Sequence, residues 1–264
     1  MLEKIYPPWS KICDRYDNLH NELKLRNPED FHRKEEALIW EQFAFELIVT
    51  ILLHENIKFH TSADDVQPKV KTLDGKTVEI DFQVIIEDKP IYFGVTHFHS
   101  RQVDLGKNLK ELNIPVTKLD THKEGTVEGV ITAGRDSNDY LNRRMVARVS
   151  KEGKNSLLND YIYIFVPKVD VGFGGGIDAM PTNFNFSSSS NYEYKQNNIS
   201  GIVLIGQCIE INGKSSKINE DKMVLKTLAL NCRSLVAKKL LELLNELRLD
   251  MTERNKQLRK SLNS

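Results

Sequence analysis

The start of the chain is predicted to form two helices of different character. Residues 9–25 have the pattern of a polar helix that ends near Asn27-Pro28. A longer helix is predicted over residues 29–55, because Pro28, Glu29 and Asp30 favour a helix start, with acidic groups facing the positive end of the helix dipole. Its run EEALIWEQFAFELIVTILL is apolar on most faces, so we expect this helix to be largely buried.

Strand patterns joined by tight turns follow. Asp74-Gly75 separates KVKTL from TVEIDFQVII as a hairpin turn would, and Asp88-Lys89-Pro90 marks a second turn before IYFGVTHF. We therefore expect three consecutive strands in an antiparallel meander. A helix over residues 138–158 leads into the buried strand YIYIFV, and ISGIVLIGQCIEI forms a further strand. A Leu-rich helix is predicted over residues 221–249.

This order of elements predicts an α/β protein with a mixed sheet flanked by helices. Residues 1–28 are expected to form an N-terminal helical extension, and residues 29–212 an α/β core. Within that core, residues 171–198 are rich in Gly, Ser and Asn, which indicates a flexible insertion. Residues 213–264 are expected to form a C-terminal helix and a basic tail.

Composition narrows the class of protein. The chain has 264 residues, 37 Lys and Arg against 37 Asp and Glu, and a hydrophobic fraction of 40%. Such a balance excludes a globally basic nucleic-acid coat but permits a local basic patch. Three cysteines without a CxxC pair favour a reducing, cytoplasmic setting. No run approaches the roughly 18 apolar residues of a membrane span, and MLEKIYPPW lacks the features of a signal peptide, so no membrane association is expected.

Glu41 is the first candidate functional residue. Its neighbours at helical spacing are all apolar: Ala37, Leu38, Ala44 and Phe45. A carboxylate on an apolar face is costly unless it is paired, hydrogen-bonded or bound to a cation. Glu41 is therefore either a group at the edge of the buried stripe that reaches solvent or an Arg, or a residue of a functional site.

Asp81 is the second candidate. Glu79, Asp81 and Gln83 alternate with apolar residues, so a continuous strand would place all three on one face. One interpretation is a solvent-facing strand surface. The apolar end of the run instead favours a central strand covered on both sides, which would make Asp81 a second semi-buried carboxylate.

The run VEIDFQVIIEDKPIYFGVTHF resembles the core of the PD-(D/E)xK, or restriction-endonuclease-like, nuclease superfamily. The resemblance covers roughly residues 30–170 and implies an α-β-β-β-α-β core. By that resemblance, Asp81 matches the Asp of the second core strand, and Glu41 matches an acid supplied by the N-terminal helix. Residues 143–166, a basic helix running into YIYIFV, match the later helix and the fourth strand.

The chain departs from the family on the third strand. Gly94, Val95 and Thr96 stand where the family has Glu-x-Lys. The resemblance then implies a rearranged site in which Glu41, Asp81 and the backbone carbonyl of Val95 hold Mg²⁺. Lys151 is the candidate for the displaced catalytic lysine.

A basic segment is the candidate nucleic-acid contact. Within residues 143–154 there is one acidic residue, Glu152, and there are five basic residues: Arg143, Arg144, Arg148, Lys151 and Lys154. Three of them share one side of a helix, so this face can neutralise phosphates, although an ordinary solvated helix face is the alternative. The expected function is a metal-dependent DNA endonuclease acting on duplex DNA. The alternatives are a degenerate relative that binds nucleic acid or a protein without cleaving, and an interaction protein that docks or forms a homodimer through its Leu-rich helix.

Overall fold

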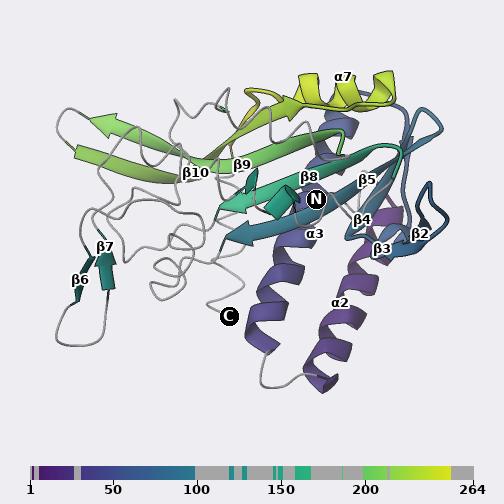
Figure 1. Ribbon diagram of the computed structural model, residues 1–264, viewed down its shortest axis with the longest axis horizontal. Helices are drawn as coiled ribbons and strands as arrows, with labels where there is room; N and C mark the ends of the chain where they lie inside the picture. Colours follow the sequence, from purple (N-terminus) through teal and green to yellow (C-terminus); the bar gives the residue numbers. More distant parts are fainter. Residues whose placement is uncertain are drawn as a thin grey trace.

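A mixed sheet of seven strands forms the centre of the protein, in the order β1-β4-β5-β8-β9-β10-β11 (Figure 1). The computed structural model describes residues 2, 6–26, 31–98, 119–121, 127–129, 145–146, 148–150, 158–167, 186, 199–212 and 215–250. The strands of the sheet are β1 (Phe59–His60), β4 (Phe82–Ile86), β5 (Lys89–Phe98), β8 (Tyr161–Pro167), β9 (Gly201–Asn212), β10 (Ser215–Ala229) and β11 (Arg248–Asp250). Strands β5, β8 and β9 run parallel, and all other neighbours are antiparallel. The expected α/β class with a mixed sheet is therefore confirmed.

The two helices predicted at the start of the chain are present. Helices α2 (Pro8–Arg26) and α3 (Phe31–His54) lie side by side (Figure 1). A stripe at three- and four-residue spacing, Trp9, Ile12 and Tyr16, buries one face of α2. The Trp9 ring meets Phe45 of α3 edge to face, with centroids 5.6 Å apart.

The prediction of one Leu-rich helix over the whole of residues 221–249 is wrong. Residues up to Ala229 belong to β10, which pairs with β9 on one side and β11 on the other, so the sheet extends past residue 212. Only α7 (Leu235–Leu244) is helical, and it begins at the cap Ser234, whose hydroxyl accepts from the Ala237 N–H at 3.1 Å. The run KMVLKTLAL satisfies a strand pattern equally well, and the cross-strand partners on β9 decide its state.

The antiparallel meander is also corrected. The segment from Thr77 to Ile86, predicted as one strand, breaks at Ile80-Asp81 into β3 (Thr77–Glu79) and β4. Among the described strands, β3 pairs with β2 (Lys69–Lys71) alone, as a separate two-stranded hairpin. Because of this break, Glu79, Asp81 and Gln83 do not form the single strand face that their alternation predicted.

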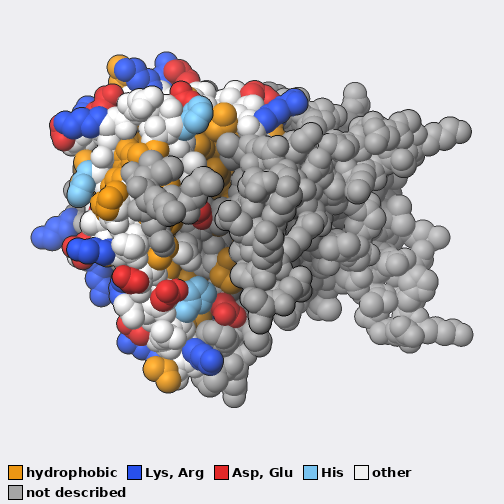
Figure 2. Space-filling view, turned by 180° about the vertical axis from the view of Figure 1, so that it is seen from behind, with side chains coloured by type: hydrophobic (Ala, Val, Ile, Leu, Met, Phe, Trp, Pro, Cys, Tyr) orange, Lys and Arg blue, Asp and Glu red, His pale blue; other side chains and the backbone are white. Residues whose placement is uncertain are grey.

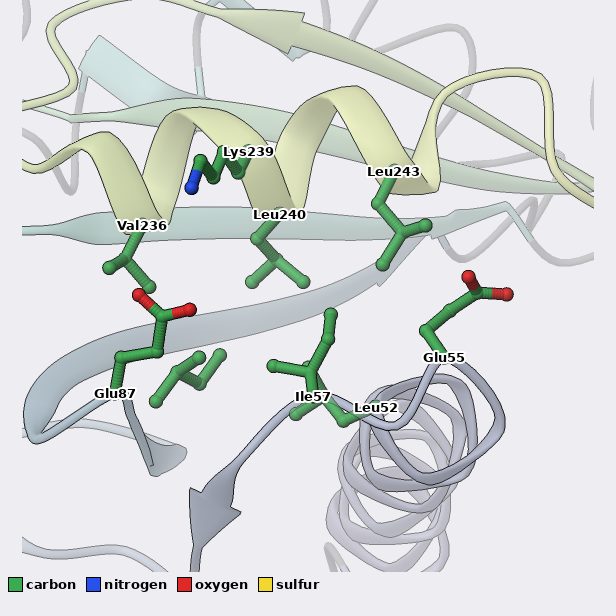
Figure 3. Close-up of a pocket in the computed structure, with 9 residues that line it drawn as sticks. Leu52, Glu55, Ile57, Glu87, Val236, Lys239, Leu240 and Leu243 are labelled. Atoms are coloured by element: carbon green, nitrogen blue, oxygen red, sulfur yellow. The ribbon is translucent and has the colours of Figure 1, made fainter.

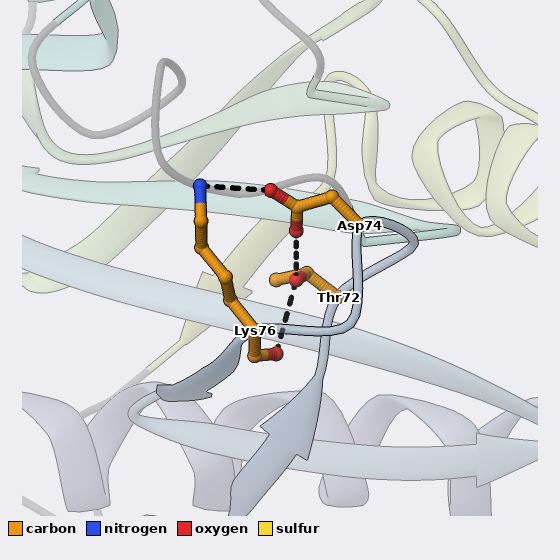
Figure 4. A network of polar contacts seen from close by, with 3 residues as sticks. All are labelled: Thr72, Asp74 and Lys76. Carbon is orange, nitrogen blue, oxygen red and sulfur yellow. Dashed lines mark hydrogen bonds and ion pairs between the residues drawn. The ribbon is translucent and has the colours of Figure 1, made fainter.

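The turn of the β2–β3 hairpin has its own polar network (Figure 4). The Thr72 hydroxyl donates to Asp74 and lies 3.0 Å from the Lys76 carbonyl, and the Lys76 ammonium lies 2.9 Å from the Asp74 carboxylate. Hydrogen bonds from Thr72 and Lys76 lower the pKa of Asp74 to about 2. Gly75 adopts φ +82°, a conformation that favours glycine, so the predicted Asp74-Gly75 turn is confirmed.

The β4–β5 connection is a two-residue turn at Glu87-Asp88, directly followed by β5. Both residues have positive φ, 49° and 61°, as a type I′ turn requires. The register Ile86↔Lys89 fixes the pairing of the two strands, so Lys89 and Pro90, predicted to lie in the turn, already belong to β5.

Apolar side chains cover both faces of the sheet. On one face α2, α3 and α7 pack against the strands, with Phe45, Phe82 and Phe93 stacked at 4.4 and 4.6 Å. A second cluster includes Val149, Tyr161 and Tyr163. Residues 145–146 and 148–150 are helical, and the remainder of the helix predicted over 138–158 lies outside the described residues, as does nearly all of the insertion predicted at 171–198.

Short elements complete the described chain. A 3₁₀ turn, η1 (Ala63–Asp65), precedes the β2–β3 hairpin, and β6 (Leu119–Thr121) pairs with β7 (Val127–Gly129). The η1 acid Asp65 is buried and accepts from the Ser62 N–H at 2.7 Å and the Gln83 amide at 2.5 Å. These bonds hold the segment that leads into the candidate site.

Candidate functional site

Glu41 lies in the middle of α3 and is only 6% exposed. Its carboxylate does not form an ion pair with any Lys or Arg in the described part of the chain. Its amide partner is Gln67, whose Nε2 donates to Oε2 at 3.1 Å and lies 3.5 Å from Oε1. Of the two interpretations of Glu41, an edge residue that reaches solvent or an Arg does not fit this burial and these partners.

Asp81 lies in the bend between β3 and β4. Its Oδ2 accepts from the Val95 N–H at 2.5 Å, and its backbone carbonyl accepts from the Gln67 N–H at 2.8 Å. Phe82, the next residue, stacks on Phe45, which stands one helical turn beyond Glu41. This stacking brings the start of β4 to the part of α3 that carries Glu41.

Gln67 links the two carboxyl groups, since its backbone binds Asp81 and its side chain binds Glu41. Its φ of 49° is unusual for a residue other than glycine, and it turns the chain from the bridge at Val66 into the hairpin. The sequence contains no periodic signal for this role, because it arises from a backbone turn and a tertiary contact.

Tyr16 of α2 completes the surroundings of Glu41. It is fully buried, and its hydroxyl faces Glu41, so that a hydrogen bond between the two side chains raises the pKa of Tyr16 and lowers that of Glu41. Burial raises the pKa of Tyr16 well above its usual range, and the nearby charges of Glu41 and Asp81 raise it further. The sequence shows Tyr16 only as a member of an apolar stripe.

The hydrogen bonds to the Glu41 carboxyl group do not offset the effects that disfavour its ionised form. Burial is the largest cause that raises the pKa of Glu41 well above its ordinary value, and the charge of Asp81 is the second. Gln67 and Tyr16 lower that pKa, and Glu79 raises it slightly. A buried carboxyl group that repels a neighbouring carboxylate is stabilised either by a proton or by a cation.

Val95 faces this site through its backbone. In a strand, the N–H and C=O of one residue point to the same side, so the Val95 carbonyl points toward the side on which its N–H meets Asp81. The amide of Val95 therefore orients Asp81, and its carbonyl points to the same edge.

The positions that replace Glu-x-Lys are Gly94 and Thr96, and a side chain at the first would displace Tyr161. A Cβ added at Gly94 would overlap the Tyr161 hydroxyl and would lie 3.0 Å from Cε2 of Tyr163. Tyr161 on β8 therefore takes the space of the acid that the family resemblance would place on β5.

Of the predicted basic residues, the structure describes Arg148 alone. Arg148 is exposed, and its Nε donates to the Tyr163 hydroxyl at 3.4 Å, beside the second apolar cluster. Arg143, Arg144, Lys151 and Lys154 lie outside the described residues. In the view of Figure 2, Lys and Arg side chains are interspersed with Asp and Glu on the described surface.

A metal ion at this site would have few protein ligands. Within the described ranges, no group of three or more His, Cys, Asp or Glu residues is arranged to hold a metal ion. Mg²⁺ is commonly bound by one or two carboxylates, with water and substrate phosphates filling the other positions. The donor set of Glu41, Asp81 and the Val95 carbonyl fits that mode of binding and does not fit an all-protein cage.

A pocket of about 260 Å³ lies between the C-terminal end of α3, the β4–β5 turn and α7 (Figure 3). Leu52, Val236 and Leu240 line it, and Glu55, Glu87 and Lys239 add charges. Leu52 is about 17 Å from Glu41 along the helix axis, given a rise of about 1.5 Å per residue. The pocket is therefore separate from the carboxyl pair.

Comparisons with known proteins give no assignment: no family model matches the chain, and no curated protein or solved structure is significantly similar to it. Among the described residues, one helical stretch, Ala37–His54, is long and apolar enough to cross a membrane by length and composition. This is weak evidence for a membrane span, because 56% of the stretch is buried inside the protein, as in the core helix of a soluble protein.

Proposed function

We propose that the chain is a metal-dependent endonuclease of the restriction-enzyme-like kind that acts on duplex DNA, with Asp81 and Glu41 as the residues that hold Mg²⁺. The observation that carries the proposal is the proximity of the buried Glu41 carboxyl group on α3 to Asp81, in the bend that precedes β4. Two carboxylates that repel each other in a poorly solvated site destabilise the folded protein unless a proton or a cation neutralises one of them.

The residues of the chain divide the work as follows. The negative charges of Glu41 and Asp81 would bind the cation. Gln67 and the Val95 N–H orient these two carboxylates. When bound, Mg²⁺ supplies a nucleophilic water and neutralises charge on the scissile phosphate. Lys151 is proposed to orient that water, in place of the lysine missing at Thr96.

The basic segment is proposed to hold the DNA. Arg143, Arg144, Arg148 and Lys154 would neutralise backbone phosphates in a sequence-independent manner. Replacing Arg144, Arg148 and Lys151 by Ala should lower the salt dependence of duplex binding by roughly 0.9 for each phosphate that is no longer neutralised. An unchanged salt slope in this triple variant would show that the segment is a solvated helix face.

A second candidate function is binding without cleavage. It is favoured by Gly94 and Thr96, which replace the usual Glu and Lys, and by Tyr161, which takes the space beside Gly94. Under this proposal the fold binds nucleic acid or a partner protein, and the carboxyl pair is a remnant.

Relaxation of supercoiled plasmid by the full chain, with Mg²⁺ or Mn²⁺ and with an EDTA control, tests both proposals. Asp81→Asn should abolish metal-dependent nicking, because it keeps the shape and removes a charged ligand, and Glu41→Gln should act likewise. Asp88→Asn is the matched control, since Asp88 lies exposed in the β4–β5 turn and Asn tolerates its positive φ. If the wild type does not nick plasmid with either metal, the endonuclease proposal fails and the binding proposal remains.

A further inference from the structure

Strand β5 extends beyond its partner β4 at the candidate site. The β4–β5 pairing ends at Phe82↔Phe93, whereas the β5–β8 pairing continues to the end of β5. Just past that point, the Asp81 carboxylate accepts from the Val95 N–H. In the described part of the chain no strand continues β4 along this edge, so side chains from either face of the sheet can reach a phosphate bound there.

An aromatic ladder covers β5 at this level, on the face of the sheet that α3 does not cover. Tyr161, Tyr163 and Phe165 alternate along β8, with ring centroids 6.1 and 4.9 Å apart. Tyr163 is the Cα partner of Gly94, and a Cβ added at Gly94 would lie 3.0 Å from Cε2 of Tyr163. Glycine at the position of the family's Glu therefore lets this ladder pack directly on β5.

Arg148 meets the middle ring of the ladder from the helical residues 148–150. Its neighbour Val149 is buried in the same apolar cluster, whereas Arg148 itself is exposed. The Arg148 Nε donates to the Tyr163 hydroxyl at 3.4 Å, and Tyr163 is only 3% exposed. A guanidinium carries four more N–H donors on its two terminal nitrogens, in a planar fork that matches the oxygens of a phosphate. A buried tyrosine thus anchors an exposed arginine through one edge of its guanidinium.

We propose that Arg148 is a catalytic residue that binds the scissile phosphate, and that Tyr163 is the positioning residue that holds it. This inference rests on the proposed endonuclease function. Gly94 is both the strand partner of Tyr163 and the residue before Val95, so Arg148 is anchored at the level of the β5 edge that binds Asp81. Its fixed positive charge stabilises the negative charge that develops on the phosphate oxygens in the transition state. Neutralisation of phosphates elsewhere along the DNA does not require such an anchor.

The experiment compares the rate of single-turnover plasmid nicking at saturating protein with the affinity for duplex DNA in EDTA. Arg148→Ala should lower the rate about 100-fold or more and raise the Kd less than about tenfold, because the contact is strongest in the transition state. Tyr163→Phe keeps the ring and removes the hydroxyl, so it should lower the rate about three- to tenfold and leave the Kd unchanged.

Two control variants match these substitutions. Arg233→Ala removes an exposed arginine just before α7, and Tyr92→Phe removes the hydroxyl of a tyrosine that packs on the same apolar cluster. Both controls should leave the nicking rate and the Kd unchanged. Arg148→Lys keeps the charge and loses the planar fork, so it should not restore the wild-type rate.

A double variant separates positioning from packing. In a protein that already carries Arg148→Ala, the further change Tyr163→Phe should not lower the rate again, because the hydroxyl acts through the guanidinium. If Tyr163→Phe lowers the rate equally with and without Arg148, the hydroxyl has a structural role and the positioning role is overturned.

The outcomes distinguish this inference from the proposed function. If the wild type nicks plasmid and Arg148→Ala nicks it equally fast at saturation, with only a weaker Kd, Arg148 is an ordinary backbone contact. The inference is then overturned and the endonuclease proposal stands. A wild type that nicks plasmid with neither metal overturns the endonuclease proposal, and the catalytic role of Arg148 with it.

Discussion

Replacing Glu41 by Gln is expected to stabilise the metal-free protein at neutral pH. The amide has nearly the same shape and keeps a carbonyl oxygen for the Gln67 bond of 3.1 Å. It removes the buried charge that Asp81 repels. Most substitutions of buried residues destabilise a protein, so a gain in the free energy of unfolding would mark Glu41 as a residue kept for function.

The sign of the pH dependence follows from the raised pKa of Glu41. Burial first, and Asp81 second, raise that pKa in the folded state well above the ordinary value of 4.5. The folded protein then binds the proton more tightly than the unfolded chain does. The resulting stabilisation is complete below the unfolded-state pKa and is lost as the pH rises through the folded-state pKa. The wild type should lose stability over this window relative to the Gln variant.

The size of the effect depends on how far the pKa is raised. Each pKa unit corresponds to about 1.4 kcal/mol in the free energy of unfolding. For a chain of this size, about 1 kcal/mol moves the Tm by roughly 2–4 °C. Burial and the charge of Asp81 raise the pKa of this group, which is 6% exposed, so the Gln variant should be the more stable of the two proteins at pH 8. At pH 4 the two proteins should have nearly equal stability.

Urea denaturation in EDTA, followed by tryptophan fluorescence from pH 4 to pH 8, measures this difference directly. Glu242→Gln is the control, because Glu242 is exposed on α7 and its pair with Lys238 at 3.8 Å contributes little. A Gln variant that is less stable than the wild type by the same amount at every pH would refute the reasoning. In that case the Glu41 charge is compensated, and the carboxyl pair does not repel.

Two further substitutions test the fold around the site. Phe82→Ala removes the middle ring of the stack between Phe45 and Phe93, and it should lower the free energy of unfolding in urea by about 3–5 kcal/mol; a loss below about 1 kcal/mol would contradict the packing. Gly94→Glu should fail to restore a family-like acid, because its Cβ meets the Tyr161 hydroxyl, and we expect a loss of about 1–3 kcal/mol in stability with no gain in nicking; a stable, more active variant would contradict this.

The sequence correctly predicts those elements whose pattern of apolar and polar residues fits a single type of secondary structure. Helix α3 is apolar on most faces and could only be a buried helix, and the Asp74-Gly75 turn defines the β2–β3 hairpin. The segment up to Ala229 fits both a helix and a strand. Its state is decided by pairing with β9, a long-range contact that local periodicity does not contain.

The sequence indicated part of the candidate site. Glu41 stands out because its helical neighbours are apolar, Asp81 because it alternates with apolar residues and matches the family Asp, and the Val95 carbonyl through the family resemblance. Gln67 and Tyr16 give no such signal, since a glutamine in a loop and a tyrosine on an apolar stripe are common. Their roles come from the turn at Gln67 and from the packing of α2 on α3, both of which exist only in the folded chain.

The central claim, that Glu41 and Asp81 together hold a divalent cation, is tested most directly by titrating the protein with Mn²⁺ and following free Mn²⁺ by electron paramagnetic resonance, with and without a duplex oligonucleotide. We expect a saturable site in the wild type. Asp81→Asn and Glu41→Gln should each weaken binding at least about tenfold, or about 1.4 kcal/mol, while Asp88→Asn should leave it unchanged. Equal affinities in the wild type and both site variants, or no binding by the wild type even with DNA, would contradict the claim.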